Sequence, residues 1–468
     1  MQSDTIRRIL SSWQATEGGA NSTASLLAWI REQNEATQVQ VEPCSITDDS
    51  FWFYDDYNGE VLNRKRSFFS ITGMRRFENE HFVYEQPIIV QPEIGYLGIL
   101  CKEINGILHF LMQAKIEPGN VNAVQISPTI QATKSNFTRA HGGRMPAYLK
   151  YFERKGNRCS VLYDQVQSEQ GAKFFKKRNR NIIIEAFGEV EALPQFKWMT
   201  LGQIKALMRV DNLVNMDTRT VLSGFPFALY RLSDGDMGAY RAYFSEEAFY
   251  RSVLLRQPKD TVTRLCGAMN DFKMYMDIDA QKVPLFQLVD WDVEPEGIVC
   301  KHPAGFEVRY YDIEIAGREV MHWMQPLFKA TGRATFGLIA KEIEGALAFL
   351  VALRSEIGTF DKVEIAPAIQ WDTEGPGAAA ARADDVQGVF AAHLQSGEGI
   401  MLDVVLSEEG GRFYHEQNRN VILKVKGGEL ETLPEGYFWA DFSGLCYLLQ
   451  ANNCLNIQLR NLLSLLPL

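Results

Sequence analysis

The sequence predicts a mixed α/β protein made of two tandem copies of one domain, each a mixed sheet flanked by helices. Three observations predict this: an internal repeat covering most of the 468 residues, strand patterns joined by tight turns, and short capped helical segments. The order expected for the first copy is a leading helix, several strands, a central hairpin, a helix near 168–177, a strand at 181–187 and a closing helix at 200–222.

The repeat is visible by direct alignment. QPII…GILCKEINGILHFL…VQISPTIQ, from Gln86, aligns without a gap with QPLF…GLIAKEIEGALAFL…VEIAPAIQ, from Gln325, at an offset of 239. SEQGAKFFKKRNRN (168–181) matches SEEGGRFYHEQNRN (407–420) at the same offset, and NLVNMDTRTVLS (212–223) matches NCLNIQLRNLLS (453–464) at an offset of 241. A repeat this long is a duplicated domain, because solenoid units are much shorter. We expect the first domain at residues 1–230 and the second at 231–468, with the boundary in the turn-rich stretch 223–243.

Local signals predict individual elements within this frame. Ser22 precedes a helical pattern of apolar residues over 22–34, which predicts a capped helix. Asn105-Gly106 lies between two strand-like segments, a pattern typical of a two-residue hairpin turn. The apolar end, LRNLLSLLPL, is too short to span a bilayer and is expected to be a docked helix.

Composition restricts the class of protein. The net charge of -10 and the isoelectric point near 5.4 argue against nucleic acid or an anionic membrane as the main partner. A small anionic ligand remains compatible, because a local cluster of Arg, Lys and backbone N–H groups binds phosphate on an acidic protein. The seven Cys are widely spaced with no CxxC motif, which indicates reduced thiols in a cytoplasmic protein. We expect no secretory signal and no membrane span.

The two copies differ most on one face of two neighbouring strands. Alternation places His109, Leu111, Gln113 and Lys115 on one face, against Ala348, Leu350, Ala352 and Arg354 in the second copy. The next strand places Gln125, Ser127, Thr129, Gln131, Thr133 and Ser135 together, against Glu364, Ala366, Ala368, Gln370 and Asp372. This face is expected to line a cleft for a ligand with many hydroxyls. The alternative is a solvated outer face of an antiparallel sheet.

Each candidate residue also has a structural explanation. A lone His such as His109 is commonly a hydrogen-bonded structural residue, and His141 lies in a Gly-rich loop where an exposed His is ordinary. Lys115 and Glu117 could simply pair with each other. Arg178 and Arg180 could bind phosphate or complement a helix terminus, and Trp198 could stack on a base or pack in the core. The sequence contains no GxGxxG, P-loop, HExxH or GxSxG motif, which weakens hydride-transfer, ATP-driven and zinc-dependent functions.

HFLMQAKIEPGN, SPTIQATKSNF, SEQGAKFFKKRNRN and NMDTRTVLS give the chain a resemblance to the NDP-hexose 2,3-dehydratase family, and the resemblance covers nearly the whole length. It implies action on dTDP-4-keto-6-deoxyglucose in deoxysugar biosynthesis, two tandem Nudix-like domains, a homodimer and no metal or other cofactor. It also implies that the first half carries the active site and the second a reduced nucleotide-sugar site. One departure is Tyr84, where the pattern has Trp two residues before Gln-Pro; the second copy keeps Trp323.

The implied reaction needs a base for the C3 proton, a donor to the C4 oxyanion and an acid for the C2 hydroxyl. The product is an unstable 3,4-diketo-2,6-dideoxyhexose, so a ketoreductase is expected to act next. The candidates for proton transfer are His109, Lys115, Glu117 and His141. The candidates for substrate binding are Gln113, Asn120, Ser127, Thr129, Gln131, Thr133, Ser135, Asn136, Lys177, Arg178, Arg180 and Trp198.

Two other functions compete with this one. The chain could be a non-catalytic nucleotide-sugar binder, although a pure binder has less reason to differentiate its two halves. It could also be a Nudix-type pyrophosphohydrolase, but the glutamate-rich box of those enzymes is not visible in either half.

Overall fold

Two seven-stranded mixed sheets dominate the computed structural model, which describes residues 2–47, 49–134, 145–153, 159–229, 238–316, 321–372 and 385–468. In each sheet one central pair of strands is parallel and the other pairs are antiparallel. The two sheets have the same strand order, so the predicted mixed α/β class and duplication are confirmed. The Nudix-like fold of each copy stays a prediction.

Corresponding strands of the two large sheets appear in the same chain order. The first sheet contains β6 (Gly95–Ile104), β7 (Ile107–Ile116), β8 (Val124–Ser127), β9 (Ile130–Ala132), β10 (Cys159–Ser168), β11 (Arg178–Ala186) and β12 (Phe196–Thr200). The second contains β18 (Thr335–Ile343), β19 (Ala346–Arg354), β20 (Glu364–Pro367), β21 (Ile369–Trp371), β22 (Ile400–Ser407), β24 (Gln417–Lys424) and β25 (Tyr437–Asp441).

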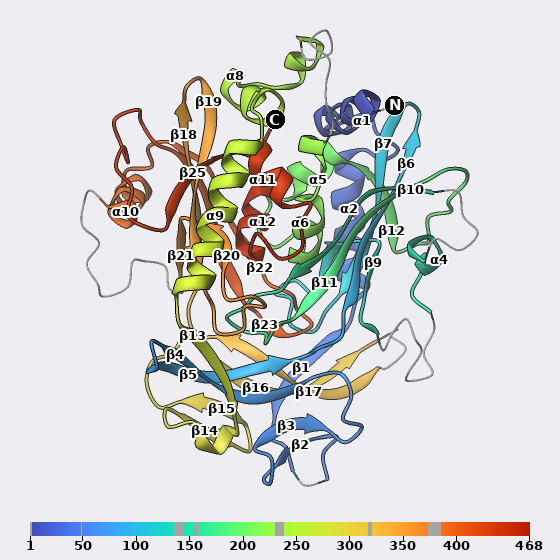
Figure 1. Ribbon diagram of the computed structural model, residues 1–468. Coiled ribbons are helices and arrows are strands. Elements are labelled where there is room, and N and C mark those ends of the chain that lie inside the picture. Colours follow the sequence, from blue (N-terminus) through green and yellow to red (C-terminus); the bar gives the residue numbers. More distant parts are fainter. Residues whose placement is uncertain are drawn as a thin grey trace.

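Helices fill the space between the two large sheets and cover their outer edges (Figure 1). The described helices are α1 (Gln2–Gln14), α2 (Thr23–Ala36), α4 (Leu149–Phe152), α5 (Leu201–Leu207), α6 (Met216–Leu222), α8 (Glu247–Tyr250), α9 (Lys259–Tyr275), α10 (Val386–Ser396), α11 (Phe442–Leu448) and α12 (Ile457–Ser464). Apolar side chains from both sheets and from all of these helices except α4 and α10 form one continuous core. Helices α4 and α10 pack in two separate apolar clusters. The two halves therefore bury their apolar surface against each other.

Two smaller sheets lie below the large ones in Figure 1, and each combines strands from both halves. One contains β1 (Val39–Cys44), β14 (Trp291–Glu294), β15 (Gly297–Cys300), β16 (Phe306–Ile315), β17 (His322–Ala330) and β23 (Phe413–Tyr414). The other contains β2 (Trp52–Asp55), β3 (Glu60–Asn63), β4 (Ser70–Glu78), β5 (His81–Val90) and β13 (Ile278–Val283). Strand β1 pairs with β16 and β13 pairs with β4, so each half gives a strand to the other.

Several local predictions are confirmed. Asn105 and Gly106 both have positive φ and join β6 to β7, as a two-residue hairpin of the primed type requires. Ser22 caps α2 by accepting a hydrogen bond from the Ser25 N–H, and the apolar C-terminal segment forms the docked helix α12.

The helix predicted near 168–177 is wrong. Residues 169–177 form turns and an irregular segment, and two of their backbone groups bond to Gly358 in the other half of the chain. The Gly171 carbonyl accepts from the Gly358 N–H at 2.7 Å, and the Lys176 N–H donates to the Gly358 carbonyl at 2.8 Å. Apart from the bond from the Phe174 N–H to the Gln170 carbonyl, tertiary pairing thus replaces the i to i−4 bonds that a helix would have made.

The closing helix predicted over 200–222 is two helices, α5 and α6. Asn212, between them, adopts a left-handed conformation with φ of 55°, which a continuous helix does not permit. Asn215 then starts α6 by accepting a hydrogen bond from the Thr218 N–H.

The continuous polar strand face predicted from Gln125 to Ser135 is also wrong within the described residues. The strand breaks at Pro128, so that β8 pairs with β7 and β9 pairs with β6. Ile126 and Ile130 consequently lie in different apolar clusters, although unbroken alternation would put them on one face.

Candidate active site

A hydrogen-bonded polar network joins β7, β9 and α6 in the first half. Lys115 Nζ lies 3.1 Å from Glu117 Oε1, which also accepts a hydrogen bond from Gln131 Nε2 at 2.9 Å. Asn215 Nδ2 donates to Gln131 Oε1 at 3.1 Å. These four residues form the first-half network. Lys115 keeps 17% of its side-chain surface exposed and Gln131 is half-buried, so the network reaches solvent.

The second half repeats this network at the equivalent positions. Arg354 Nε lies 3.7 Å from Glu356 Oε1, Gln370 Nε2 donates to that oxygen at 2.6 Å, and Asn456 Nδ2 donates to Gln370 Oε1 at 3.2 Å. Arg354, Glu356, Gln370 and Asn456 form the second-half network. The polar network was therefore kept in both copies, and the predicted loss of polarity in the second copy does not extend to it.

Each network is completed by a loop from the opposite half. Beside the first-half network, the Gly119 N–H donates to the Gly410 carbonyl at 2.8 Å. A Cβ atom on Gly411 would lie 2.8 Å from Glu409 Oε1 and 3.6 Å from Glu117 Oε1, so this glycine separates carboxylates from two halves of the chain. Gln325 fixes the loop by donating to the Gly411 carbonyl at 3.0 Å.

Replacement of Gly119 by alanine should test this exchange of loops. Its Cβ would lie 1.7 Å from the Phe413 carbonyl oxygen, so the loop must move. We expect the free energy of unfolding to fall by about 1–3 kcal/mol, as in other overpacked sites. Gly358→Ala is the matched control, because its Cβ would lie 1.9 Å from the Phe174 carbonyl oxygen beside the second-half network. Urea unfolding should show similar losses in the free energy of unfolding for both variants, and turnover should be impaired in Gly119→Ala only. Equal turnover in the two variants would contradict the assignment of the active site to the first-half network.

Three carboxyl groups that are buried or half-buried, Glu169, Asp217 and Glu409, lie next to the first-half network and are called the acidic cluster here. Burial, and after it the charge of Glu409, raises the pKa of Glu169 to about 7. Burial and the charge of Glu409 also raise the pKa of Asp217 well above its usual value. Burial raises the pKa of Glu409 itself. Glu169 can therefore hold and release a proton near neutral pH, and the raised pKa values of Asp217 and Glu409 favour their protonated forms.

The acidic cluster and the first-half network leave buried acceptors without protein partners in the described part of the chain. These atoms are Glu117 Oε2, Asn120 Oδ1, Glu169 Oε2 and Asp217 Oδ2. Unsatisfied buried oxygens are costly, and they are commonly found where a ligand or water completes the hydrogen bonding. These oxygens are therefore placed to accept hydrogen bonds from the donor groups of a ligand or from water.

Lys115, Glu117, Asn120, Gln131 and Lys177 are the predicted site residues that the structure brings together. Asn120 contacts the Gly410 backbone, with the position of a Gly410 Cβ lying 2.3 Å from Asn120 Oδ1. Lys177 donates to the Glu93 carbonyl at 2.5 Å, and its positive charge acts on Glu169 and Glu409.

His109 does not belong to this group. It lies at the opposite end of β7 from Lys115, about 20 Å away at the usual rise of a strand. Its Nε2 accepts from the Ala20 N–H at 2.9 Å, and its Nδ1 lies 2.8 Å from the Ile107 carbonyl. Burial lowers the pKa of His109. The imidazole therefore ties the N-terminal segment to the sheet.

His109→Ala is expected to lower stability without removing the chemistry. The loss of two backbone hydrogen bonds at a 1% exposed side chain should cost about 1–3 kcal/mol. Chemical denaturation should show this loss, and kcat should stay within about threefold of the wild type under folding conditions. A decrease in turnover rate by about 100-fold, with unchanged stability, would restore His109 as an acid–base candidate.

The other predicted sugar contacts of the first sheet lie away from the network or serve the backbone. Thr129 donates its hydroxyl hydrogen to the Leu111 carbonyl and accepts from the Leu100 N–H, which closes the gap at the strand break. Ser127 is buried and bonds to the Gln125 carbonyl. Gln113 and Thr133 are half-buried. Ser135, Asn136 and His141 lie outside the described residues.

The predicted diphosphate and base contacts also have structural roles. Arg180 makes two hydrogen bonds of 2.6 Å to the Asp164 carboxylate, and the Arg178 guanidinium stacks 3.8 Å from the centre of the Phe360 ring. Trp198 is buried in an apolar cluster of the first sheet. These three side chains are therefore occupied by partners within the chain.

Tyr84, the residue that departs from the family pattern, lies beside the second-half network. The charges of Glu356 and Arg354 act on the Tyr84 hydroxyl, whereas Trp323 packs with Ile116 next to the first-half network. Trp323 also bonds to Gln325, the residue that holds the Gly411 carbonyl. The aromatic residue beside the first-half network is thus the retained tryptophan.

Sequence comparison of the two copies could have found the acidic cluster. Asp217 aligns with Gln458, and Glu409 aligns with Gln170, so both differences exchange an acid for an amide. Glu169 lies next to Gln170 in the repeat segment 168–181, which aligns with 407–420. The signal was missed because the comparison followed strand faces, while these residues lie in a loop and on a helix.

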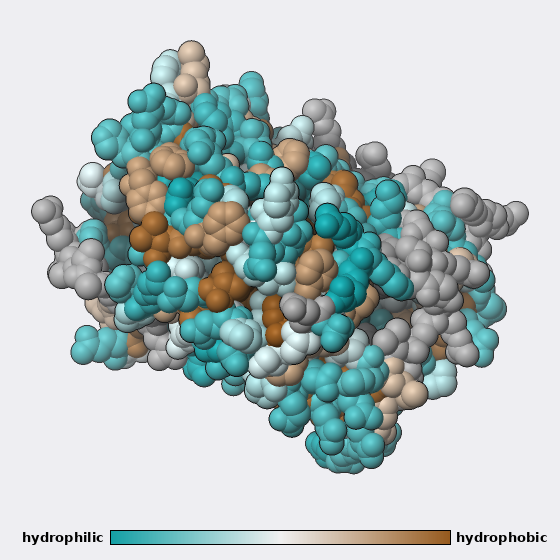
Figure 2. All heavy atoms as spheres, turned by 90° about the horizontal axis from the view of Figure 1, so that it is seen from below, coloured by the Kyte–Doolittle hydropathy of each residue, from teal (hydrophilic) through white to brown (hydrophobic). Residues whose placement is uncertain are grey.

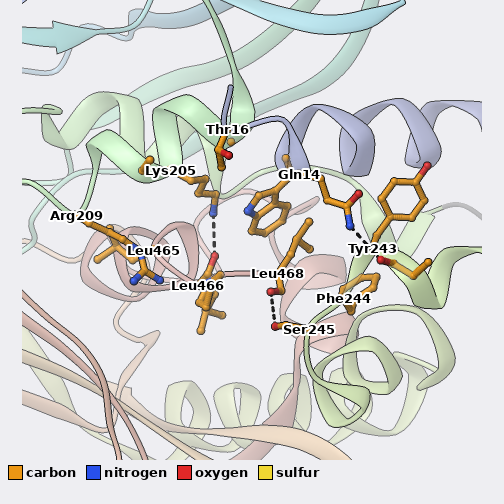
Figure 3. A pocket seen from close by; sticks show the side chains of 15 residues that line it. Gln14, Thr16, Lys205, Arg209, Tyr243, Phe244, Ser245, Leu465, Leu466 and Leu468 are labelled. Atoms are coloured by element: carbon orange, nitrogen blue, oxygen red, sulfur yellow. Dashed lines mark hydrogen bonds between the residues drawn. The ribbon is translucent and has the colours of Figure 1, made fainter. Parts of the chain in front are cut away.

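A separate cavity of about 470 Å³ lies between α1, α5 and the last residues of the chain (Figure 3). Lys205 points into it and is held by the carbonyl oxygens of Ser464 and Leu466. Its described lining residues include no Asp, Glu or His. Lys205 is its one described side chain whose pKa burial brings to about 7, and it has no side-chain carboxylate or imidazole to act beside that lysine. The acidic cluster, with three carboxyl groups, is the better candidate for the active site.

Two searches of the described residues were negative. No described helix has both the length and the apolar character needed to span a membrane. No three His, Cys, Asp or Glu side chains in these ranges converge in an arrangement that could hold a metal ion.

Comparisons with known proteins agree with the duplication and identify its family. The sequence profile of the family described as NDP-hexose 2,3-dehydratase matches the chain twice, over residues 23–225 and 263–466. A protein of Streptomyces violaceoruber named dTDP-4-dehydro-6-deoxy-alpha-D-glucopyranose 2,3-dehydratase is 37% identical over 94% of this chain and 96% of its own length. Proteins of the same name from Saccharopolyspora spinosa and Amycolatopsis orientalis are 36% and 33% identical, over 99% and 98% of this chain and 95% and 93% of their own lengths. The chain belongs to the NDP-hexose 2,3-dehydratase family.

Proposed function

We propose that this protein is a sugar-nucleotide 2,3-dehydratase, a hydro-lyase that removes water across C2 and C3 of dTDP-4-keto-6-deoxyglucose in deoxysugar biosynthesis. The observation that carries the proposal is the match over nearly the full length to three relatives that bear this name. The acidic cluster, largely buried beside the partly exposed Lys115, supports it from the chemical side.

The reaction needs only groups of the kind that this site holds. The C4 ketone acidifies the C3 proton, so that a base can remove it and leave an enolate. A cation or N–H donor stabilises the developing C4 oxyanion, and an acid protonates the departing C2 hydroxyl. The enol that remains becomes a 3,4-diketo-2,6-dideoxyhexose. The ketone accepts the electrons throughout.

The roles follow from where each group lies. Lys115 is the cation best placed to stabilise the C4 oxyanion, because its ammonium group is partly exposed at the edge of the network. Glu117 holds that ammonium group in place, and Gln131 with Asn120 offers amide groups to sugar hydroxyls. Of the three cations predicted to bind the diphosphate, Lys177 is the one that lies next to the acidic cluster.

Incubation with dTDP-4-keto-6-deoxyglucose in the presence of EDTA tests the proposal. Mass spectrometry should show the loss of one water from the sugar nucleotide, and addition of a ketoreductase with its reductant should trap the unstable product. Release of dTMP would instead indicate a Nudix-type pyrophosphohydrolase. Binding without any change in mass would indicate a non-catalytic nucleotide-sugar binder.

A homodimer belongs to the same proposal. Exposed apolar side chains lie on β5 and at the end of α9, including Phe82, Val83, Met274 and Tyr275. Strand β13, which follows α9, pairs with β4 next to β5, so these side chains belong to neighbouring elements. The lower face of the molecule shows apolar patches between hydrophilic surface (Figure 2). Light scattering of the wild type and of a Phe82→Ser, Met274→Ser variant would test whether this surface joins two subunits.

A further inference from the structure

The two copies of the site differ at two positions where the first copy has an acid. Asp217 on α6 corresponds to Gln458 on α12, and Glu409 in the loop after β22 corresponds to Gln170 in the loop after β10. The flanking residues are kept, since Glu169 corresponds to Glu408 and Asn179 to Asn418. Asn179 donates to Glu169 and Asn418 donates to Glu408 in the same manner, at 2.7 and 2.5 Å.

The second copy shows what an amide does at the Glu409 position. Gln170 Nε2 donates a hydrogen bond to Glu408 Oε2. In the first copy this position holds the carboxyl group of Glu409, whose charge acts on Glu169 and which can donate a hydrogen bond only when it is protonated. Like charges on these carboxyl groups penalise one another, and the cations Arg412, Lys115, Lys177 and Arg460 offset part of that penalty. The first copy therefore has a titratable group where the second copy has an amide.

Asp217 belongs to the same group. The charges of Glu409, Glu169 and Glu117 all act on the Asp217 carboxyl, and Glu409 has the largest effect among them. Asp217 is 2% exposed, and its Oδ2 is without a hydrogen-bond partner in the described chain. Glu409 is only half-buried, and the nearby Lys115 is partly exposed. The two carboxyl groups, Asp217 and Glu409, therefore extend from the interior toward the solvent-accessible part of the network.

We propose that Glu409, supplied by the second half of the chain, and Asp217, supplied by the first, share one proton and form the acid–base pair of the dehydration. This inference rests on the proposed function. It assigns to the second half a direct part in the reaction, because the loop that carries Glu409 is held at the first-half network by the Gly119–Gly410 and Gln325–Gly411 hydrogen bonds.

A pair with one proton contains the two states that the reaction needs. The carboxylate takes the C3 proton, and the electron pair of that bond moves into the enolate. The enolate then expels the C2 hydroxyl, which leaves as water with the proton of the carboxylic acid. The resulting enol takes a proton at C2 from the first group and gives its C3 hydroxyl proton to the second. The pair thus returns to a single proton, and the only other product is water.

Glu409→Gln and Asp217→Asn test the pair. Glutamine is expected to fit at position 409, because the counterpart of Glu409 in the other copy is Gln170. Each variant should lower kcat by about 100-fold or more, the lower range for loss of a positioned acid or base. KM should change by less than about threefold, and Glu409→Asp should recover part of the lost kcat. Glu364→Gln is the matched control: it removes another buried carboxyl whose counterpart, Gln125, is already an amide, and it should keep wild-type kcat.

Two further measurements separate the pair from a structural role and from failure of the proposed function. In D₂O, one of the two variants, the one that has lost the acid, should still exchange the C3 proton of the substrate while eliminating water slowly. The other variant, which has lost the base, should neither exchange this proton nor eliminate water. In the ligand-free protein at neutral pH, difference infrared spectra against the wild type should show loss of the same protonated-carboxyl band in Glu409→Gln and in Asp217→Asn, whereas Glu364→Gln should remove a different band, because burial raises the pKa of Glu364 to about 7. This spectrum requires no substrate, so it tests the shared proton even if the wild type proves inactive toward dTDP-4-keto-6-deoxyglucose. Wild-type turnover in either variant, or an unchanged infrared signal in both, would overturn the inference.

Discussion

Lys115→Met is expected to lower kcat by about 10²–10³-fold, the usual loss when one donor to a developing oxyanion is removed. The methionine side chain has a similar length and no charge. It can fill the space of the lysine side chain but cannot stabilise negative charge on the C4 oxygen of the substrate. Glu117, which lies 3.1 Å from the lysine ammonium, keeps the Gln131 hydrogen bond in the variant.

Arg354→Met supplies a control matched in position and in the charge removed. Arg354 bears the same relation to Glu356 as Lys115 does to Glu117, at a longer distance of 3.7 Å. Both variants leave a buried glutamate with one partner fewer, so their losses in unfolding free energy should be similar. Steady-state kinetics should show the large fall in kcat for Lys115→Met alone. Equal effects on kcat would mean that Lys115 acts only through stability.

The thermal stability of the ligand-free protein is expected to fall as the pH rises from about 5 to 8. Burial and the charge of Glu416 raise the pKa of Glu408 to about 8, and burial raises the pKa of Glu364 to about 7. In this window the folded protein keeps protons that the unfolded chain has released. Each such group therefore removes up to about 1.4 kcal/mol of stability for every pH unit between 4.5 and its folded pKa.

Glu408→Gln should make this decline less steep, since glutamine does not titrate and Gln170 lies next to it as a hydrogen-bonding partner. Scanning calorimetry at several pH values would measure the slope of Tm against pH for both proteins. A variant whose Tm falls as steeply as that of the wild type would contradict the assignment.

Lys205 should act in the opposite direction at higher pH. Burial lowers the pKa of Lys205 to about 7, so the folded protein releases this proton before the unfolded chain does. Between pH 7 and about 10 the folded state gains stability as the pH rises. The combined effect is a minimum of stability near pH 7–8, and Lys205→Met should remove only the alkaline side of that minimum.

The sequence by itself determined the duplication, the mixed α/β class and the central hairpin at Asn105-Gly106. It also predicted as site residues a set that lies close together in the structure, namely Lys115, Glu117, Asn120, Gln131 and Lys177. These features depend on local periodicity, on turn chemistry and on an alignment of the chain with itself, all of which are encoded over short distances. The family resemblance added the reaction, which no spacing of residues could have supplied.

Only the tertiary structure decided which residues meet. The local pattern predicts a helix over 168–177, but backbone hydrogen bonds join this segment to Gly358 in the opposite half and to Ile89 in β5, and no local pattern records such partners. His109 and Lys115 share a strand face, yet they lie at opposite ends of β7. Glu409 lies 292 residues beyond Glu117 in the chain and reaches it because the two halves exchange loops across their common core. A contact of this kind depends on how two surfaces pack, and packing is a property of the folded chain as a whole.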